Sequence, residues 1–254
     1  LCLGLNPQIE GEAGDAFNSE FAGDKADLEL PGLQKLLLEK IAAVGKPVIL
    51  VSVSGSALAL PEELADGVIQ CFYPGAEGGT ALGNVLSGKV NPSGRLPVTF
   101  YRSADDLPPF EDYAMQGRTY RFFEGEVLHP FGFGLSYTSF ACSGLSVPEQ
   151  VAAGTPVKAE LLVENTGERA GETVIQLYVT AIRPPTRTPL KQLAAVERIA
   201  LQAGESRKVE LTVDPDSFLL TFDDGSRRIQ PGTWRIEIGS DSRTTLADAE
   251  VRLC

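Results

Sequence analysis

The period of the hydrophobic pattern changes once along the chain, and this change limits the possible folds. Up to about residue 102, short apolar runs alternate with stretches of helical spacing, whereas after about residue 140 apolar residues recur at every second position. The first pattern is typical of a mostly parallel sheet with helices on both faces, and the second of an antiparallel sandwich. We therefore predict an α/β sandwich domain followed by an all-β sandwich.

Three apolar runs are predicted as strands of the first domain. They are LCLGL, VILVSV and VIQCFYP, at residues 1–5, 48–53 and 68–74. The middle run is apolar on both faces, which is expected of a strand inside a parallel sheet. The strand predicted for LCLGL already includes the first residue, so we expect this sequence to be part of a longer protein.

Helices are predicted between these strands and after them. LQKLLLEKIAAVG places Leu33, Leu37, Ile41 and Val44 at helical spacing, and Gly45 is the predicted stop signal. GAEGGTALGNVLSG is predicted as a Gly-rich turn that leads into a second helix, and NPSGRLPVTF as a turn and a last strand. These elements complete a first domain over residues 1–102.

Residues 103–140 have no clear period and are dense in Pro, Gly and aromatic residues. Since disordered segments are poor in aromatics, we predict an ordered connector held by its aromatic side chains. The second domain is predicted over residues 141–254.

The second domain is predicted from short strands of period two. VKAELLVE places Val157, Ala159, Leu161 and Val163 on one face, and TVIQLYVT, RKVELTV and TWRIEIG follow with turn signals between them. The single tryptophan, Trp234, alternates with apolar residues, so we interpret it as a core residue and not as a ligand platform.

Composition excludes several classes of function. The formal net charge is −12, and no basic stripe or Lys/Arg-rich run is present, so nucleic acid and anionic membranes are not expected as partners. The longest apolar runs are far shorter than the roughly 20 residues of a membrane-spanning helix.

Cysteine and histidine usage argues against metal and triad chemistry. Cys2, Cys71, Cys142 and Cys254 lie far apart with no C-x-x-C pair, so we predict buried or free thiols, no metal site and no cofactor. His129 is the only histidine, and no G-x-S-x-G motif accompanies it, so a Ser-His-Asp triad is not predicted.

The stretch IEGEAGD, directly after the first predicted strand, carries two glutamates. Glu10 and Glu12 are either a catalytic acid with a companion or solvated side chains of a loop. A general acid needs a raised pKa, which burial or a neighbouring carboxylate provides. Glu10 and Asp15 are both near enough in sequence to be that neighbour of Glu12, and the residues alone do not choose between them.

Three long stretches, in order and in spacing, resemble the C-terminal half of glycoside hydrolase family 3, the β-glucosidases and β-xylosidases. They are CFYPGAEGGTALGNVLSGKVNPSGRLPVTF, GRTYRFFEGEVLHPFGFGLSYTSF and VENTGERAGETVIQLYV. The resemblance implies a retaining exo-glycosidase with an N-terminal (β/α)8 barrel, an α/β sandwich domain and a fibronectin type III-like domain. It also implies that the nucleophile is an Asp of the barrel, which this sequence does not contain.

The resemblance further implies site residues. By its position in IEGEAGD, Glu12 matches the family's general acid/base, with Glu10 as the alternative; Ala13 stands where many relatives carry Gly or Glu. Apart from the resemblance, sugars stack on aromatic faces, so Tyr120 and Phe122 are candidates to line a sugar subsite together with Phe123; packing between domains is the alternative for all three.

The implied substrate is a β-linked oligosaccharide or an aryl glycoside, either xyloside or glucoside. The implied partner is a (β/α)8 barrel in cis or in trans, a homo-oligomer is compatible with the pattern, and an extracellular or periplasmic location is favoured because such enzymes are often exported. Two other readings stay open: a non-catalytic carbohydrate-associated module, and a chain that is active only when joined to a barrel-bearing partner.

Overall fold

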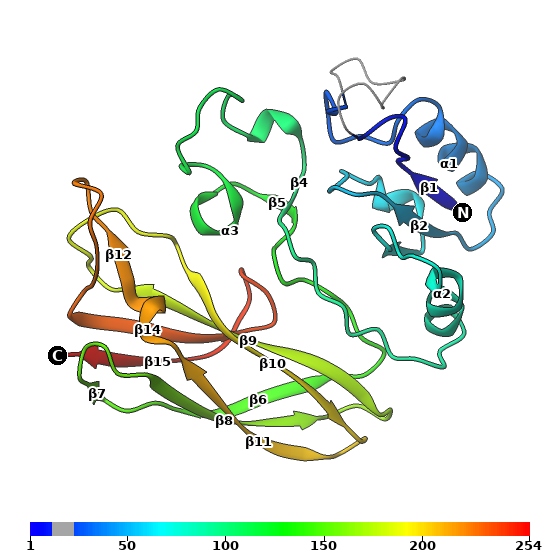
Figure 1. The fold of residues 1–254 in the computed structure, drawn as a ribbon. Coiled ribbons are helices and arrows are strands. Elements are labelled where there is room, and N and C mark those ends of the chain that lie inside the picture. Colours follow the sequence, from blue (N-terminus) through cyan, green and yellow to red (C-terminus); the bar gives the residue numbers. More distant parts are fainter. Residues whose placement is uncertain (12–22) are drawn as a thin grey trace. The chain divides into compact units, whose positions relative to one another are not determined.

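The computed structural model describes residues 1–11 and 23–254, which divide into two compact units (Figure 1). The first unit comprises Leu1–Ser87, Thr99–Tyr113 and Gly125–His129. The second comprises Gly88–Val98, Ala114–Glu124 and Pro130–Cys254. The chain therefore passes between the units several times in the region 88–130.

The first unit is built on a three-stranded parallel sheet in the order β1-β2-β3. Its strands are β1 (Cys2–Gly4), β2 (Ile49–Val53) and β3 (Gly67–Gln70). Both pairings are parallel, as predicted. The third strand is shorter than its apolar run because Phe72, with φ of 51°, turns the chain out of the extended conformation.

Two helices longer than one turn belong to the described part of this unit. α1 (Gln34–Ala42) places Leu38, fully buried, in a core with Leu3 and Leu50. α1 ends as predicted, since Gly45 adopts φ of 71° and donates its N–H to the carbonyl of Ala42 at 3.1 Å.

The predicted cover of helices on both faces of the sheet is not confirmed. α2 (Gly78–Leu86) has the predicted position, but Gly78 is its only buried residue. Of the residues whose spacing predicted α1, Leu33, Leu37 and Val44 are exposed. Helical spacing correctly predicted the helix, but its core contacts come from Leu38 and, of the predicted face, from Ile41 alone.

Several short elements complete the first unit and the segments that join it to the second. The first unit contains the 3₁₀-helices η1 (Glu62–Leu64) and η2 (Ala104–Asp106) and the strands β4 (Phe100–Tyr101) and β5 (Val127–His129). β4 and β5 pair antiparallel. The second unit contains α3 (Thr119–Phe122). None of the helices in the described ranges is long and apolar enough to cross a membrane.

The second unit consists of two antiparallel sheets with a common core, apart from one parallel edge pair. The five-stranded sheet has the order β10-β9-β14-β15-β7, and the three-stranded sheet the order β11-β8-β6. The strands are β6 (Phe140–Ser146), β7 (Gln150–Val151), β8 (Val157–Asn165), β9 (Gly171–Ala181), β10 (Gln192–Leu201), β11 (Ser206–Val213), β14 (Gly232–Gly239) and β15 (Thr245–Leu253). The 3₁₀-helix η3 (Pro215–Phe218) and the hairpin β12 (Leu219–Thr221) and β13 (Arg227–Ile229) complete the unit.

The core between these sheets confirms the period-two prediction. The inward residues of β8 are buried: Val157, Ala159, Leu161 and Val163. Trp234 on β14 is 4% exposed and lies in the same core, as predicted. Burial of such alternating apolar faces from both sheets is the main stabilising term of a sandwich.

Candidate active site

The carboxyl ends of the parallel strands define one edge of the first unit's sheet. In open sheets of this kind, ligands bind in the crevice outside this edge. The segments that leave it begin at Leu5, Ser54 and Cys71. The glutamates of IEGEAGD belong to the first of these segments, so the candidate site is built here.

The chain turns tightly after β1 and brings Glu10 back toward the sheet. The N–H groups of Ile9 and Glu10 both donate to the carbonyl of Asn6 at 3.0 Å. The Asn6 side chain accepts from the N–H of Gln8 at 3.0 Å, which is the Asx-type turn expected of this residue. Local hydrogen bonds thus place the backbone of Glu10.

The carboxylate of Glu10 is held by the loop after β2. Ser56 donates its hydroxyl to Oε1 of Glu10. Oε2 is buried, and among the described residues no donor reaches it. A buried carboxylate oxygen without a donor is unfavourable. The described residues therefore satisfy only one of the two carboxylate oxygens of Glu10.

Lys25 lies in the same electrostatic environment. Its ammonium group donates to the carbonyl of Ala57 at 2.8 Å. Burial lowers the pKa of Lys25, and the negative charges of Glu10 and Asp27 oppose this shift. Lys25 therefore places a half-buried positive charge near the Glu10 carboxylate.

Two further side chains tie β3 to the loop after β2. The amide of Gln70 donates to Oγ of Ser54 at 3.0 Å, and Ser54 donates to the carbonyl of Ser56 at 2.7 Å. Ser54 is fully buried. Its hydroxyl therefore shapes the loop that carries Ser56, which is a structural role and not that of a nucleophile.

Tyr73 also lies at this edge, although no sequence motif predicted a role for it. Its side chain is 52% exposed, directly after the turn at Phe72. A Cβ atom added to Gly55 would lie 2.8 Å from Cε2 of Tyr73 and 3.5 Å from Oε2 of Glu10. The tyrosine ring and the carboxylate therefore approach the same point beside Gly55.

The predicted acid/base Glu12 lies outside the described residues. The same holds for Asp15, the other candidate neighbour. Of the two glutamates in IEGEAGD, the structure places only Glu10. The role of Glu12 stays a prediction.

The only histidine in the sequence is hydrogen-bonded to a glutamate of η1. Nε2 of His129 on β5 lies 2.6 Å from Oε1 of Glu62 in η1. All four cysteines are free thiols, as predicted. Within the ranges that the structure describes, no group of three or more His, Cys, Asp or Glu side chains is arranged to hold a metal ion.

The aromatic residues proposed as a sugar subsite lie in the second unit. The ring of Tyr120 stacks on Phe131, with centroids 4.4 Å apart, and meets Tyr178 edge-on at 6.2 Å. Its hydroxyl accepts the N–H of Leu193 at 3.2 Å. Tyr120 thus packs within the second unit, on the start of β10, and both its sugar-binding role and a role in packing between domains stay predictions.

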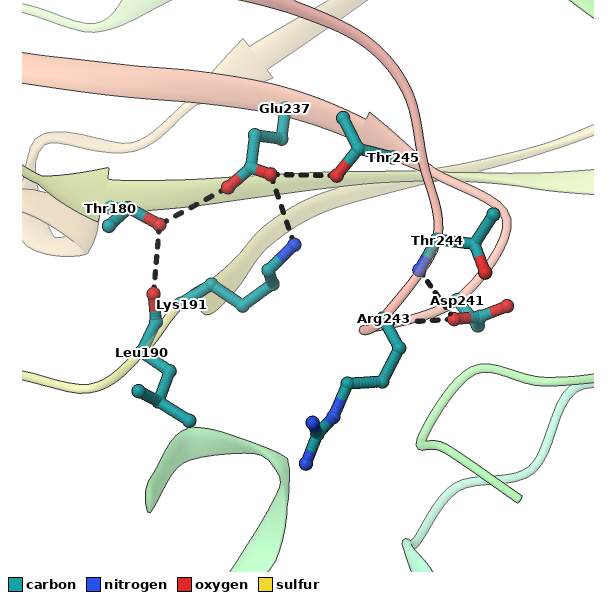
Figure 2. A network of polar contacts seen from close by, with 8 residues as sticks. All are labelled: Thr180, Leu190, Lys191, Glu237, Asp241, Arg243, Thr244 and Thr245. Atoms are coloured by element: carbon teal, nitrogen blue, oxygen red, sulfur yellow. Dashed lines mark hydrogen bonds and ion pairs between the residues drawn. The ribbon is translucent and has the colours of Figure 1, made fainter. Parts of the chain in front are cut away.

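The residues after Tyr120 are attached to the same unit. The Cζ atom of Arg121 lies 5.8 Å from the ring centroid of Phe122. Phe123 is buried, and its carbonyl accepts from the guanidinium of Arg243 at 2.7 Å. Hydrogen bonds from the N–H groups of Arg243 and Thr244 to Asp241, at 2.7 and 2.8 Å, fix the loop that carries Arg243 (Figure 2).

A buried carboxylate organises the neighbouring strands of the second unit. Figure 2 shows Glu237 on β14 accepting hydrogen bonds from Lys191 at 3.1 Å, Thr245 at 2.8 Å and Thr180 at 3.3 Å. The Thr180 hydroxyl also lies 3.1 Å from the carbonyl of Leu190, so its single hydrogen is shared between that carbonyl and Glu237. Burial disfavours the charged form of Glu237, but the hydrogen bonds outweigh it and lower its pKa.

Comparison with protein families identifies both units. The glycosyl hydrolase family 3 C-terminal domain matches residues 1–137, more than half of the 254 residues, and the fibronectin type III-like domain matches residues 173–242. The chain belongs to glycosyl hydrolase family 3. This confirms the resemblance drawn from the three sequence stretches.

Relatives from this family cover nearly the whole chain. A protein of Xylanibacter ruminicola named xylan 1,4-β-xylosidase is 42% identical over 248 residues, which is 95% of this chain and 28% of the relative. A protein of Salmonella typhimurium named periplasmic β-glucosidase is 36% identical over 237 residues, 87% of this chain and 31% of the relative.

Solved structures show the same fold. A β-glucosidase from Erythrobacter marinus is 34% identical with a TM-score of 0.87, and the match covers all of this chain and 34% of that one. A β-glucosidase from Listeria innocua, solved in complex with glucose, is 28% identical with a TM-score of 0.83, covering all of this chain and 36% of that one. This family 3 chain thus spans about a third of the length of these relatives.

Proposed function

We propose that this chain is the C-terminal part of a retaining, exo-acting β-glycosidase, a β-xylosidase or β-glucosidase that removes terminal β-linked sugars from oligosaccharides. Its role is to supply the general acid/base from the segment after β1. The nucleophilic Asp comes from a (β/α)8 barrel, joined in cis or in trans. The observation that carries the proposal is the carboxylate-bearing segment at the carboxyl edge of the sheet, in a chain whose relatives are named for these activities.

The chemistry requires two carboxyl groups about 5 Å apart on either side of the glycosidic bond. One attacks the anomeric carbon as the leaving-group oxygen takes a proton from the other. The second group then removes a proton from water, which attacks the glycosyl-enzyme. Two domains that contribute one carboxyl group each satisfy this requirement without a metal or an organic cofactor.

We propose Glu12 as the acid/base, with Glu10 as the alternative. Support comes from the environment of Glu10, since Ser56 occupies one of its oxygens and the other is buried. A carboxylate that is hydrogen-bonded inside the unit is suited to hold a loop in place. A proton donor must instead reach the leaving-group oxygen of the substrate.

We propose further that residues 1–102 form the catalytic part, 103–140 an ordered connector and 141–254 the fibronectin-like part. The packing of Tyr120 on Phe131 supports a connector held by aromatic residues. The buried polar network around Glu237 supports a bracing role for the fibronectin-like part.

The test compares Glu12→Gln and Glu10→Gln in the complete enzyme, meaning this chain together with its barrel. If Glu12 is the acid/base, Glu12→Gln lowers turnover of substrates with poor leaving groups by about 10²-fold or more, since this is the scale of general acid catalysis. Substrates with activated leaving groups lose less in the first step, and azide restores turnover by replacing water as the nucleophile.

Glu29→Gln is the matched control, because Glu29 is an exposed carboxylate of the same unit that pairs with Lys35. It is expected to leave turnover unchanged. Azide rescue in Glu10→Gln and not in Glu12→Gln would transfer the role to Glu10. Hydrolysis of nitrophenyl β-glycosides by the isolated chain would contradict the proposal that the nucleophile belongs to the barrel and the acid/base to this chain.

A further inference from the structure

Tyr73 combines exposure with a restrained backbone, which is uncommon for a large aromatic residue. The preceding Phe72 has φ of 51°, a left-handed conformation that is unfavourable for an L-residue and persists only when its surroundings impose it. The following Pro74 packs against the start of α2, since a Cβ on Gly78 would lie 2.5 Å from Cγ of Pro74. Both neighbours of Tyr73 are therefore held in place.

The absence of a side chain at Gly55 lets the Tyr73 ring lie next to β2. The ring occupies space that a Cβ on Gly55 would need, with only 2.8 Å to Cε2. Gly55 has no left-handed backbone angle, so its conformation does not require glycine. The close approach of the ring is the physical reason that glycine fits here.

A polar group adjoins the ring. Oε2 of Glu10, buried and without a donor among the described side chains, lies 3.5 Å from the same point beside Gly55. Because this oxygen is buried, the accessible surface at this point is the exposed ring of Tyr73. An exposed aromatic ring offers the C–H groups of a pyranose a flat apolar face.

We propose that Tyr73 is the stacking platform for the leaving-group part of the substrate, a pyranose or aryl ring. The inference rests on the proposed function, because a segment that protonates the leaving-group oxygen also brings its neighbours close to the leaving group. Tyr73 extends from the same sheet edge as that segment. It is a specificity-determining residue and takes no part in proton transfer.

The experiment uses the complete enzyme and two substrates with the same sugar on the nonreducing side. One is a β-linked disaccharide, whose leaving group is a pyranose; the other is the β-glycosyl fluoride, whose leaving group is too small to stack. Tyr73→Ala is expected to lower kcat/KM for the disaccharide about tenfold, mostly through KM, and to leave the fluoride within about twofold. Tyr73→Phe keeps the ring and is expected to behave as the unsubstituted enzyme.

Gly55→Ala provides a second variant, because its methyl group displaces the ring without removing it. It is expected to reproduce the substrate pattern of Tyr73→Ala. Two controls match these variants: Tyr113→Ala removes a tyrosine of the same unit that is 88% exposed, and Gly79→Ala adds a methyl group where no atom lies within 4 Å. Neither control is expected to change the ratio between the two substrates.

Equal losses on the disaccharide and the fluoride in Tyr73→Ala would assign a structural role to Tyr73 and overturn the inference. Unchanged kinetics on both substrates would overturn it as well, and would leave the proposed function intact. If the unsubstituted enzyme hydrolyses neither substrate, the proposed function fails and the inference fails with it.

Discussion

The hydroxyl of Ser56 donates to Oε1 of Glu10, so the loop after β2 holds the carboxylate that follows β1. The two residues are 46 positions apart in the chain and meet because β1 and β2 are adjacent and parallel. Lys25 adds a positive charge near this pair. The loop that we propose to carry the acid/base is thus anchored two residues before Glu12.

Replacing Ser56 tests this anchor. Ser56→Ala removes the hydrogen bond to a half-buried carboxylate and is expected to reduce the stability of the first unit by about 1.5–3 kcal/mol. Hydrogen exchange of the β1 and β2 amides measures this loss. Ser87→Ala is the control, because Ser87 is exposed and makes only a 3.3 Å bond to the carbonyl of Asn84. Equal protection in both variants would show that Ser56 does not anchor the loop.

The buried pair of Lys191 and Glu237 predicts a pH-dependent stability. Lys191→Met leaves Glu237 buried with one donor fewer and is expected to cost about 3 kcal/mol at pH 7. The pKa of Glu237 is lowered by folding, so its contribution is present above the unfolded value of about 4.3 and is lost as the pH falls through the folded value. The difference between variant and parent is therefore expected to shrink in acid.

Urea unfolding followed by the fluorescence of Trp234 measures this difference, because the single tryptophan is buried in the same unit. Lys158→Met is the control, since Lys158 and Glu210 form an exposed pair on the surface. It is expected to change stability little at any pH. A cost for Lys191→Met that stays constant down to pH 3 would contradict the role of the Glu237 charge.

Asn165 is predicted to be the most sensitive polar residue of the sandwich. Its side chain is fully buried; it accepts from the Thr138 hydroxyl at 2.7 Å and donates to the carbonyls of Arg169 at 2.7 Å and Leu201 at 3.2 Å. Asn165→Ala leaves several buried groups unpaired and is expected to cost about 3 kcal/mol or more. The neighbouring exposed Glu164 is the control, and Glu164→Ala in urea titrations is expected to cost less than about 0.5 kcal/mol.

Alanine substitutions at two glycines distinguish the cost of backbone strain from the cost of a side-chain clash. Gly132 and Gly204 both have left-handed backbone angles, with φ of 84° and 73°. A Cβ on Gly132 would lie 2.0 Å from Oε1 of Gln176, whereas no atom lies within 4 Å of one on Gly204. Thermal unfolding should show that Gly204→Ala costs about 1–2 kcal/mol and Gly132→Ala clearly more. Equal costs would mean that Gln176 moves away freely.

Equal costs for the two glycine variants are not expected, because the Gln176 side chain is buried and its amide group is fully hydrogen-bonded. Its amide donates to the carbonyls of Gly132 at 3.0 Å and Ser240 at 2.8 Å, and it accepts from the hydroxyl of Tyr178 at 2.6 Å. A shift of Gln176 would therefore break three hydrogen bonds in the second unit.

Element types followed from the sequence wherever one period persisted over several residues. The alternation of Val157, Ala159, Leu161 and Val163 correctly predicted a strand with one buried face. β10 and β15 were not predicted. A register shift near Leu193 breaks the alternation of β10, and small alanines take inward positions on β15. Both strands form because their neighbours in the sheet supply hydrogen bonds that the pattern alone does not reveal.

The sequence by itself determined the family, the change from helix-and-strand to strand-only structure, and the two glutamates after the first strand. These three features depend on local residue patterns and on long sequence motifs, which do not require knowledge of the three-dimensional structure. Only the tertiary structure decided which residues meet at the sheet edge. Ser56, Tyr73 and Glu10 come from three separate segments, and they converge because parallel pairing brings the carboxyl ends of their strands to one edge.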